Sequence, residues 1–225
     1  MSLDRRTFNR IAFGGIAAGV ATGVAATGAA LLPMPGIAAS ATSPDYAPVR
    51  SDSAFGSYTQ KWFVDSFLEL ADDLAEARAA GKRFAIMWEL EGCPYCRETH
   101  LVNFAIPAVT DFIRANFAIV QLDVKGARRV KNLDGTEMSE RELAALFQVR
   151  HTPTIQFFPE TLEQAKAKRG REMEVGRIPG YLRPFHFLTY FQYVAEKAYT
   201  RENFHKYLKS RVAQLERSGK GVPAW

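Results

Sequence analysis

One four-residue motif constrains this chain more than any other feature. Cys93-Pro94-Tyr95-Cys96 follows an apolar run, residues 84–88, that suits a buried strand, and it opens a helical stretch that reaches about Phe104. The sequence has two cysteines among 225 residues, and both belong to this motif. A single pair cannot build the disulfide framework of a small secreted scaffold, an all-cysteine zinc site or an iron–sulfur cluster. The cysteine chemistry of the chain must therefore fit in this pair.

The position of the motif between a strand and a helix predicts thiol–disulfide exchange. Cys93 stands at the helix N-terminus, where unpaired N–H groups and the helix dipole favour a thiolate. Cys96 follows one turn later, is expected to be more buried, and stays a thiol until it is needed. Cys93 would attack a substrate disulfide, and Cys96 would then attack Cys93 to release the product; the reverse sequence makes an oxidase. The sequence therefore predicts two catalytic residues, Cys93 and Cys96, and a redox-active dithiol in place of a cofactor.

Three other uses of such a motif can be compared with this one. A structural disulfide across two residues closes so small a loop that it would constrain the unfolded chain little. A haem attachment motif needs histidine directly after the second cysteine, and Arg97 stands there. A zinc-binding module could recruit His100 as a third ligand, although a fourth ligand is not apparent. Outside that alternative, we expect His100 to be a solvated residue on the helix surface.

The first 41 residues have the layout of an export signal. The twin arginine Arg5-Arg6 precedes an uncharged Gly/Ala-rich run, residues 11–32, and Ala39-Ser40-Ala41 offers a cleavage site. The twin arginine resembles the Tat class of signals, which predicts a periplasmic location. An uncleaved signal that anchors the protein is the alternative, because the run is long enough to span a bilayer.

The net charge gives little support to a nucleic-acid partner. The chain has 29 Lys and Arg residues against 24 Asp and Glu residues, formally +5. Three arginines and one aspartate lie in residues 1–41, so the mature chain keeps +3. No interleaved basic and aromatic motif is present in the sequence. We therefore expect no nucleic acid among the partners.

The mature chain is predicted to be one α/β domain, residues 55–216, between a flexible leader (42–54) and a C-terminal tail (217–225). Helices are expected at 62–80, 94–104, from 107 onward, 140–147, 184–199 and 201–216. Strands are expected at 84–88, 118–124, 154–158 and 172–178. The last two strands are expected to pair antiparallel across a turn at 168–170. Residues 125–138 form a polar excursion with a turn signal at Asp134-Gly135.

Local signals support several of these boundaries. Phe63, Phe67, Leu70 and Leu74 recur at helical spacing in the segment 62–80, and Gly81 follows where a left-handed cap is expected. Ser139 and Glu142 form a capping box at the start of the helix 140–147.

Thr152-Pro153, directly before the strand 154–158, completes a resemblance to the thioredoxin superfamily. Together with the cysteine motif and the order of elements, it makes residues 82–199 similar to that family. The resemblance implies a thioredoxin-like fold, a central mixed sheet flanked by helices, here with an extra N-terminal helix and a C-terminal helical extension. It implies a cis Thr152–Pro153 bond beside the cysteines, with the Thr152 backbone pairing with an extended substrate. Substrate contacts are then expected from Pro94, Tyr95, Thr152 and Pro153.

Three further segments resemble the SoxW-type periplasmic thioredoxins of bacterial sulfur-oxidation systems. They are Glu91-Gly92 with the cysteine motif, the insertion with Leu133-Asp134-Gly135, and residues 180–196. This resemblance implies an exported thiol reductant that receives electrons from a membrane protein of the CcdA/DsbD kind. The implied partners are proteins that carry thiols, disulfides or sulfur adducts, sulfur carriers included, and the protein is expected to be a monomer.

Two departures from ordinary thioredoxin bear on the chemistry. The dipeptide between the cysteines is Pro94-Tyr95 rather than Gly-Pro, and Met87 replaces the buried acid of the preceding strand. Glu89, also in that strand, could act as the proton shuttle or could point to solvent at the strand end. Dithiols of this superfamily span roughly −270 to −120 mV, so the motif does not fix the direction of electron flow. A reductase is favoured, and an oxidase, a disulfide isomerase or a substrate-binding protein of the same fold is the alternative.

Overall fold

A computed structural model describes residues 46–48 and 58–225 of the chain. The predicted signal (1–41) and most of the predicted leader (42–54) lie outside the described residues. Within the described part, no helix has both the length and the apolar character needed to cross a membrane. The export signal and the alternative anchor therefore stay predictions.

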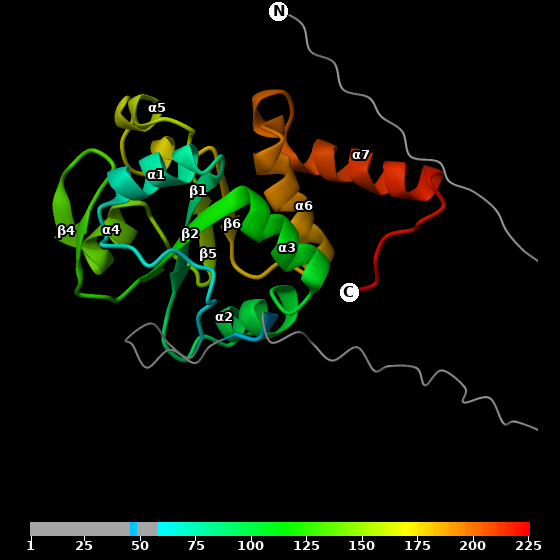
Figure 1. Ribbon diagram of the computed structural model, residues 1–225, viewed down its shortest axis with the longest axis horizontal. Helices are drawn as coiled ribbons and strands as arrows, with labels where there is room; N and C mark the ends of the chain where they lie inside the picture. Colours follow the sequence, from blue (N-terminus) through cyan, green and yellow to red (C-terminus); the bar gives the residue numbers. More distant parts are fainter. Residues whose placement is uncertain (1–45, 49–57) are drawn as a thin grey trace, which may run out of the picture. The chain divides into compact units, whose positions relative to one another are not determined.

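The centre of the domain is a four-stranded mixed sheet in the order β2-β1-β5-β6 (Figure 1). Its strands are β1 (Arg83–Glu89), β2 (Phe117–Asp123), β5 (Thr154–Phe157) and β6 (Gly176–Pro179). β1 runs parallel to β2, while β1 with β5 and β5 with β6 are antiparallel. The helices are α1 (Leu70–Ala79), α2 (Pro94–Glu98), α3 (Pro107–Asn116), α4 (Glu140–Leu146), α5 (Leu162–Lys166), α6 (Pro184–Ala195) and α7 (Phe204–Arg217). The predicted thioredoxin-like fold is confirmed, including a helix before β1 and helices after β6.

All seven residues of β1 are buried, and their alternation divides the core into two layers. Phe84, Ile86 and Trp88 pack with apolar residues of α1 and α4. Ala85 and Met87 pack on the other face with apolar residues of α3 and α6. By the same alternation Glu89, the last residue of β1, belongs to the face of Met87, so its carboxyl group is directed into the protein.

The first helix is shorter than predicted. The segment 62–80 was expected to be helical throughout, but α1 begins at Leu70. Leu68 has a left-handed backbone (φ 65°), and its carbonyl accepts a hydrogen bond of 2.8 Å from the N–H of Lys131. Phe67, expected on the apolar face, is 98% exposed. The helical spacing was misleading here because the backbone before Leu70 bonds to another segment instead of to its own next turn.

The connection from β5 to β6 is also different from the prediction. A tight turn at 168–170 was expected, but α5 and a 3₁₀ helix, Gly170–Met173, occupy the connection. Thr161 caps α5 through its side chain, which accepts from the N–H of Gln164. As a result β6 begins at Gly176 rather than at residue 172, while its antiparallel pairing with β5 is as predicted.

The turn and capping signals in the polar excursion are confirmed. The strands β3 (Arg129–Lys131) and β4 (Glu137–Ser139) pair antiparallel, and Asp134-Gly135 lies in the loop between them. Ser139 and Glu142 form the capping box at the start of α4. Each of these features depends on residues that are close together in the sequence, so the sequence alone could predict it.

The C-terminal helices have slightly different limits from those expected. α6 ends at Ala195 because Lys197 adopts a left-handed backbone (φ 53°), and α7 begins after the Asn203 cap. The Tyr207 ring of α7 packs against the Tyr193 ring of α6 at 5.3 Å. This aromatic contact attaches the C-terminal extension to the domain.

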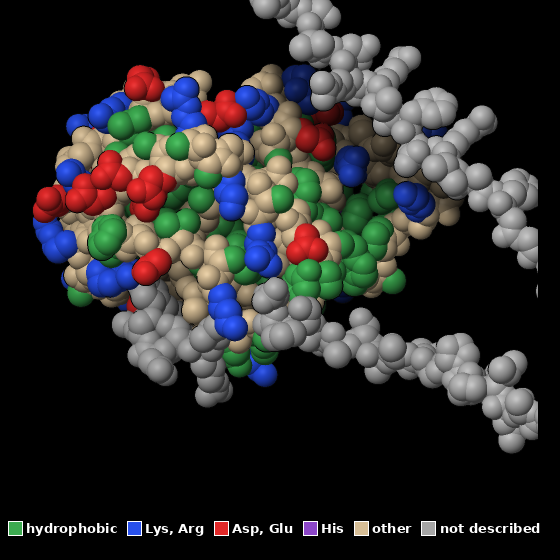
Figure 2. Space-filling model, viewed as in Figure 1, with side chains coloured by type: hydrophobic (Ala, Val, Ile, Leu, Met, Phe, Trp, Pro, Cys, Tyr) green, Lys and Arg blue, Asp and Glu red, His purple; other side chains and the backbone are tan. Residues whose placement is uncertain are grey.

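Charged side chains of both signs are dispersed over the face shown in Figure 2. Acidic side chains gather at the end of this face where the β3–β4 hairpin lies. The visible face therefore has no field of a single sign, and the absence of a nucleic-acid partner stays a prediction.

Asp73 in the first turn of α1 gives a test of pH-dependent stability. Burial raises the pKa of its carboxyl from 3.8 to about 6, although the Ser66 hydroxyl donates to it at 2.6 Å. The folded state therefore binds the proton more tightly than the unfolded state, so this residue costs stability as the pH rises from about 4 to above 6. Asp73→Asn keeps an acceptor for Ser66 and removes the charge. We expect it to stabilise the protein at neutral pH by about 1 kcal/mol, less than the full shift implies, because nearby solvent screens the charge.

Urea unfolding of Asp73→Asn and of the unchanged protein at about pH 4 and about pH 7.5 measures this effect. The difference should disappear at the lower pH, where the folded carboxyl is protonated. Glu216→Gln, at an exposed position on α7 that does not act on Asp73, is the control and should show no comparable pH dependence. An equal gain at both pH values would contradict the assignment to the Asp73 charge.

Candidate active site

The two cysteines are joined as a disulfide at the junction of β1 and α2. Cys93 is the N-cap of α2, and Pro94 occupies the first turn, where a missing N–H does not matter. The N–H of Cys96 donates to Cys93 Sγ at 3.1 Å. Cys93 is half-buried, whereas Cys96 is 5% exposed. The outer cysteine thus has access to a partner and a donor for its thiolate, and the inner cysteine is shielded, as the sequence predicted.

The loop before β5 lies directly against Cys93. The Thr152–Pro153 peptide bond is cis, as the resemblance implied. Thr152 Oγ1 lies 3.3 Å and the Thr152 carbonyl oxygen 3.4 Å from Cys93 Sγ. The Pro153 carbonyl accepts from the N–H of Gly180 at 2.8 Å, which fixes this loop to the residue after β6. Fifty-nine positions separate Cys93 from Thr152 in the sequence, and the fold brings them together.

An open groove of about 670 Å³ lies between the cysteine motif and this loop. Its lining residues are Tyr95, Arg150, His151, Thr152, Pro179, Gly180 and Tyr181. The Tyr95 ring is 60% exposed and stacks on the Tyr181 ring at 6.0 Å, with 19° between the planes. Burial, and next the charge of Glu98, raise the pKa of Tyr181, so its hydroxyl stays neutral. The sequence had singled out Tyr95 and Thr152 for this groove but not Arg150, His151 or Tyr181 as contacts.

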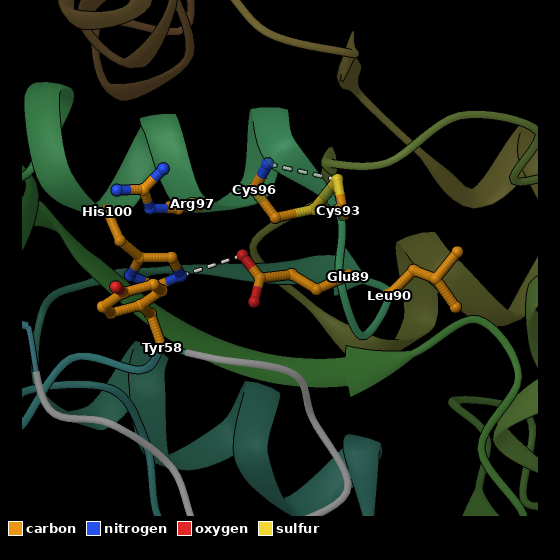
Figure 3. A pocket seen from close by; sticks show the side chains of 7 residues that line it. All are labelled: Tyr58, Glu89, Leu90, Cys93, Cys96, Arg97 and His100. Carbon is orange, nitrogen blue, oxygen red and sulfur yellow. Dashed lines mark hydrogen bonds and ion pairs between the residues drawn. A yellow bond between two sulfur atoms is a disulfide. The ribbon is translucent and has the colours of Figure 1, made fainter.

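Behind the cysteines lies a buried ion pair. His100 Nε2 is 2.8 Å from Glu89 Oε1, and Figure 3 shows the carboxylate directed toward the imidazole ring. His100 is fully buried and Glu89 is 2% exposed. The expectation that His100 is a solvated surface residue is therefore wrong, and the alternative that Glu89 points to solvent is wrong too. His100 comes four residues after the buried Cys96, which puts both on the inner face of the helical stretch.

A small cavity of about 10 Å³ connects this pair with the dithiol. It is lined by Tyr58, Glu89, Leu90, Cys93, Cys96, Arg97 and His100 (Figure 3). This volume corresponds to about one water molecule. Cys96 and Glu89 thus face the same small enclosed space. A second partner, Gln121 Nε2, donates to the other carboxylate oxygen of Glu89.

The zinc alternative finds no support in this geometry. In the described part of the chain, no group of three or more His, Cys, Asp or Glu side chains is placed to hold a metal ion. Both ring nitrogens of His100 already have partners, since Gln60 Nε2 lies 3.0 Å from Nδ1 and Glu89 bonds to Nε2. The structure therefore assigns His100 to the carboxylate of Glu89 rather than to the cysteines.

Comparison with known proteins gives a family match over most of the domain. Residues 70–195 match the family described as a thioredoxin-like domain. Among solved structures, a thioredoxin-fold protein from Helicobacter pylori is 18% identical, with a TM-score of 0.49, covering 60% of this chain and 86% of that chain. A thioredoxin from Thermus thermophilus is 27% identical, with a TM-score of 0.42, covering 57% of this chain and 85% of that chain. A search of curated proteins found no match. The matched region contains both the cysteine motif and the loop with Thr152.

Proposed function

The chain belongs to the thioredoxin-like domain family, and from that premise we propose that it is a thiol–disulfide oxidoreductase that reduces disulfides or sulfur adducts of partner proteins. One observation carries the proposal: the Cys93–Cys96 pair is at disulfide distance, with the outer sulfur beside the cis-proline loop. The pair supplies the redox chemistry by itself, so the reaction needs no cofactor.

The burial of the two sulfurs gives each a separate task. With the dithiol reduced, the Cys93 thiolate attacks one sulfur of the substrate, and the other substrate sulfur leaves with its electron pair and takes a proton. The mixed disulfide then contains Cys93. Cys96 loses its proton and attacks Cys93 Sγ, which forms the Cys93–Cys96 bond and releases the second substrate thiolate. Two electrons have then passed from the protein to the substrate.

The Glu89 carboxylate is proposed as the acceptor of the Cys96 proton. It is buried, it lines the same small cavity as Cys96, and it is held in place by two donors, His100 and Gln121. A base in this place matters because Cys96 is shielded from bulk water and a thiol is a poor nucleophile until it is ionised.

The open groove is proposed as the place where the substrate chain lies. The Thr152 backbone can pair with an extended segment in the manner of an added strand. Pro94 follows Cys93 in the sequence, Pro153 follows Thr152, whose oxygens lie beside the Cys93 sulfur, and the exposed Tyr95 ring lines the groove. Substrate contacts are therefore proposed for Pro94, Tyr95, Thr152 and Pro153.

The location and the electron source extend the same proposal. The twin-arginine layout of residues 1–41 and the SoxW-type segments support export to the periplasm. There the dithiol would receive electrons from a membrane protein of the CcdA/DsbD kind and pass them to protein disulfides or sulfur carriers. The protein is proposed to act as a monomer.

The direction of electron flow can be tested with the purified protein in glutathione redox buffers of graded composition. We expect a reduction potential near the reducing end of the range for this superfamily, roughly −270 mV, and catalysed reduction of insulin disulfides with dithiothreitol as the electron source. A variant with both cysteines replaced by alanine should give only the uncatalysed rate. A potential near roughly −120 mV without insulin reduction would overturn the reductase and indicate an oxidase.

A further inference from the structure

We propose that His100 is a positioning residue of the dithiol exchange: supported by Gln60, it orients the Glu89 carboxylate toward Cys96 and shares the proton that the carboxylate takes from the thiol. The inference rests on the proposed exchange and adds to it a two-residue proton store behind the cysteines.

Burial makes the pair interdependent. Glu89 is 2% exposed and His100 fully buried, and in the part of the chain that the structure describes their contact is the one ion pair of either residue. A buried carboxylate is costly unless it is paired and hydrogen-bonded. The His100 N–H therefore supports the ionised form of Glu89, and only the ionised form can accept the Cys96 proton.

Gln60 lets the imidazole exist in two protonation states. With Gln60 Nε2 as donor to Nδ1, at 3.0 Å, the neutral ring carries its proton on Nε2 and donates to Glu89. With the amide turned by 180°, Gln60 Oε1 accepts from Nδ1–H and supports the imidazolium. Gln60 Oε1 is buried and has no hydrogen-bond partner in the described structure. Rotation of the Gln60 amide by 180° therefore breaks no hydrogen bond of this oxygen. The pair can thus take up one proton without losing its contacts.

The segment that supplies Gln60 lies outside the family-matched region 70–195. Tyr58 covers the same site, because its ring stacks on the His100 ring at 6.3 Å and its carbonyl accepts from Gln121 Nε2 at 3.0 Å. Gln60 itself is 3% exposed. Residues 58–60, which precede the family-matched region, therefore cover the Glu89–His100 pair and support it by hydrogen bonds.

The other charged and titratable groups around the pair are few. Arg97 lines the cavity from the α2 side and carries a positive charge. Asp123, which is the register partner of Glu89 on β2, adds a negative charge. Tyr58 and the two cysteines are the other titratable residues of the lining. These groups are present in every variant below, so a change in pH dependence reports on the pair.

The proton and electron balance of the step closes within the protein and its substrate. The Cys96 S–H bond breaks, the proton goes to the Glu89–His100 pair, and the electron pair remains on Cys96 Sγ. This sulfur forms the bond to Cys93 Sγ while the bond from Cys93 to the substrate sulfur breaks. The leaving thiolate then takes the proton held by the pair, which returns to its first state.

The reaction of the reduced full chain with 5,5′-dithiobis(2-nitrobenzoate) separates this step from the first attack. The first thionitrobenzoate is released in a phase that depends on reagent concentration and reports on Cys93. The second is released in a concentration-independent phase that reports on attack by Cys96. In His100→Gln the amide can donate to Glu89 but cannot take up a proton. We expect the second phase to slow about tenfold near pH 7 and its pH profile to lose one ionisation, with the first phase unchanged within about twofold.

The control is His205→Gln, an exposed histidine on α7 that should leave both phases unchanged. A second-phase pH profile of His100→Gln that superimposes on that of the unchanged protein would overturn the inference. If His100→Gln does not fold, Gln60→Leu decides instead. It should move the midpoint of the second-phase profile to lower pH, because the imidazolium loses its acceptor, and an unmoved midpoint would overturn the inference. Failure of the proposed function looks different, since the unchanged protein would then show no second phase.

Discussion

Cys96→Ala is expected to turn the protein from a catalyst into a trap that retains partner proteins as mixed disulfides on Cys93. The variant keeps the half-buried sulfur beside Thr152, so the first attack proceeds. It lacks the shielded sulfur that resolves the adduct, so the exchange stops halfway. Multiple turnover should fall by a factor on the order of 10³ or more, since removal of one member of a catalytic pair disables the pair.

Gel electrophoresis without reductant, followed by mass analysis of the adducts, measures this outcome. Cys93→Ala is the matched variant, and it should form no adducts because Cys96 is 5% exposed and cannot reach a partner. Equal trapping by both variants, or by neither, would refute the assignment of attacking and resolving cysteines. In the native host, the identity of the trapped proteins would also test the proposed sulfur-carrier partners and membrane electron donor.

The structural features that could be predicted are those that depend on residues close together in the sequence. The apolar run before Cys93, the capping box of Ser139 and the turn at Asp134-Gly135 all formed as expected. The contact of Thr152 with Cys93 spans the whole domain, and it followed only from the resemblance to a family in which that loop lies beside the cysteines. Local chemistry predicts elements, and the family supplies their arrangement.

The errors arose where a distant segment decided the local structure. Leu68 leaves the helical conformation because its carbonyl bonds to Lys131, a residue that no local pattern connects with it. His100 was expected at the surface as an isolated polar residue, although its spacing of four from Cys96 pointed inward. The missed signal is that His100 and Cys96 lie on the same face of the helical stretch. His100 can be buried because the Glu89 carboxylate, at the end of β1, pairs with its imidazole ring.

The site also shows how a carboxylate can serve the inner cysteine from a different strand position. Met87 fills the core position that an acid occupies in many thioredoxins, and it is fully buried. Glu89 lies two residues further along the same face of β1, a displacement of about 6.6 Å toward the end of the strand. At that position it meets the helical stretch that carries both Cys96 and His100. The strand end is also where Gln60 and Gln121 supply further hydrogen bonds.

Glu89→Gln is therefore expected to slow the attack of Cys96 on the mixed disulfide by about 100-fold near neutral pH, as is typical when a general base is removed. The amide has nearly the shape of the carboxylate and keeps an oxygen for the His100 N–H, but it cannot accept the thiol proton. The concentration-independent phase of thionitrobenzoate release measures this step, and the first phase should stay within about twofold. Glu98→Gln is the matched control, because this exposed carboxylate on α2 lies near the motif but not in the cavity. Equal slowing by both variants would assign the effect to general charge rather than to proton transfer.

The double variant Glu89→Gln/His100→Gln distinguishes a residue that acts through Glu89 from one that acts alone. If His100 works only by orienting and sharing the proton of the carboxylate, its substitution should have no further effect once the carboxylate is gone. The double variant should then match Glu89→Gln within about twofold, although His100→Gln alone costs about tenfold. A further tenfold loss in the double variant would show that His100 reaches Cys96 by a route that bypasses Glu89. The two ring nitrogens of His100 contact Glu89 and Gln60, which favours the route through Glu89.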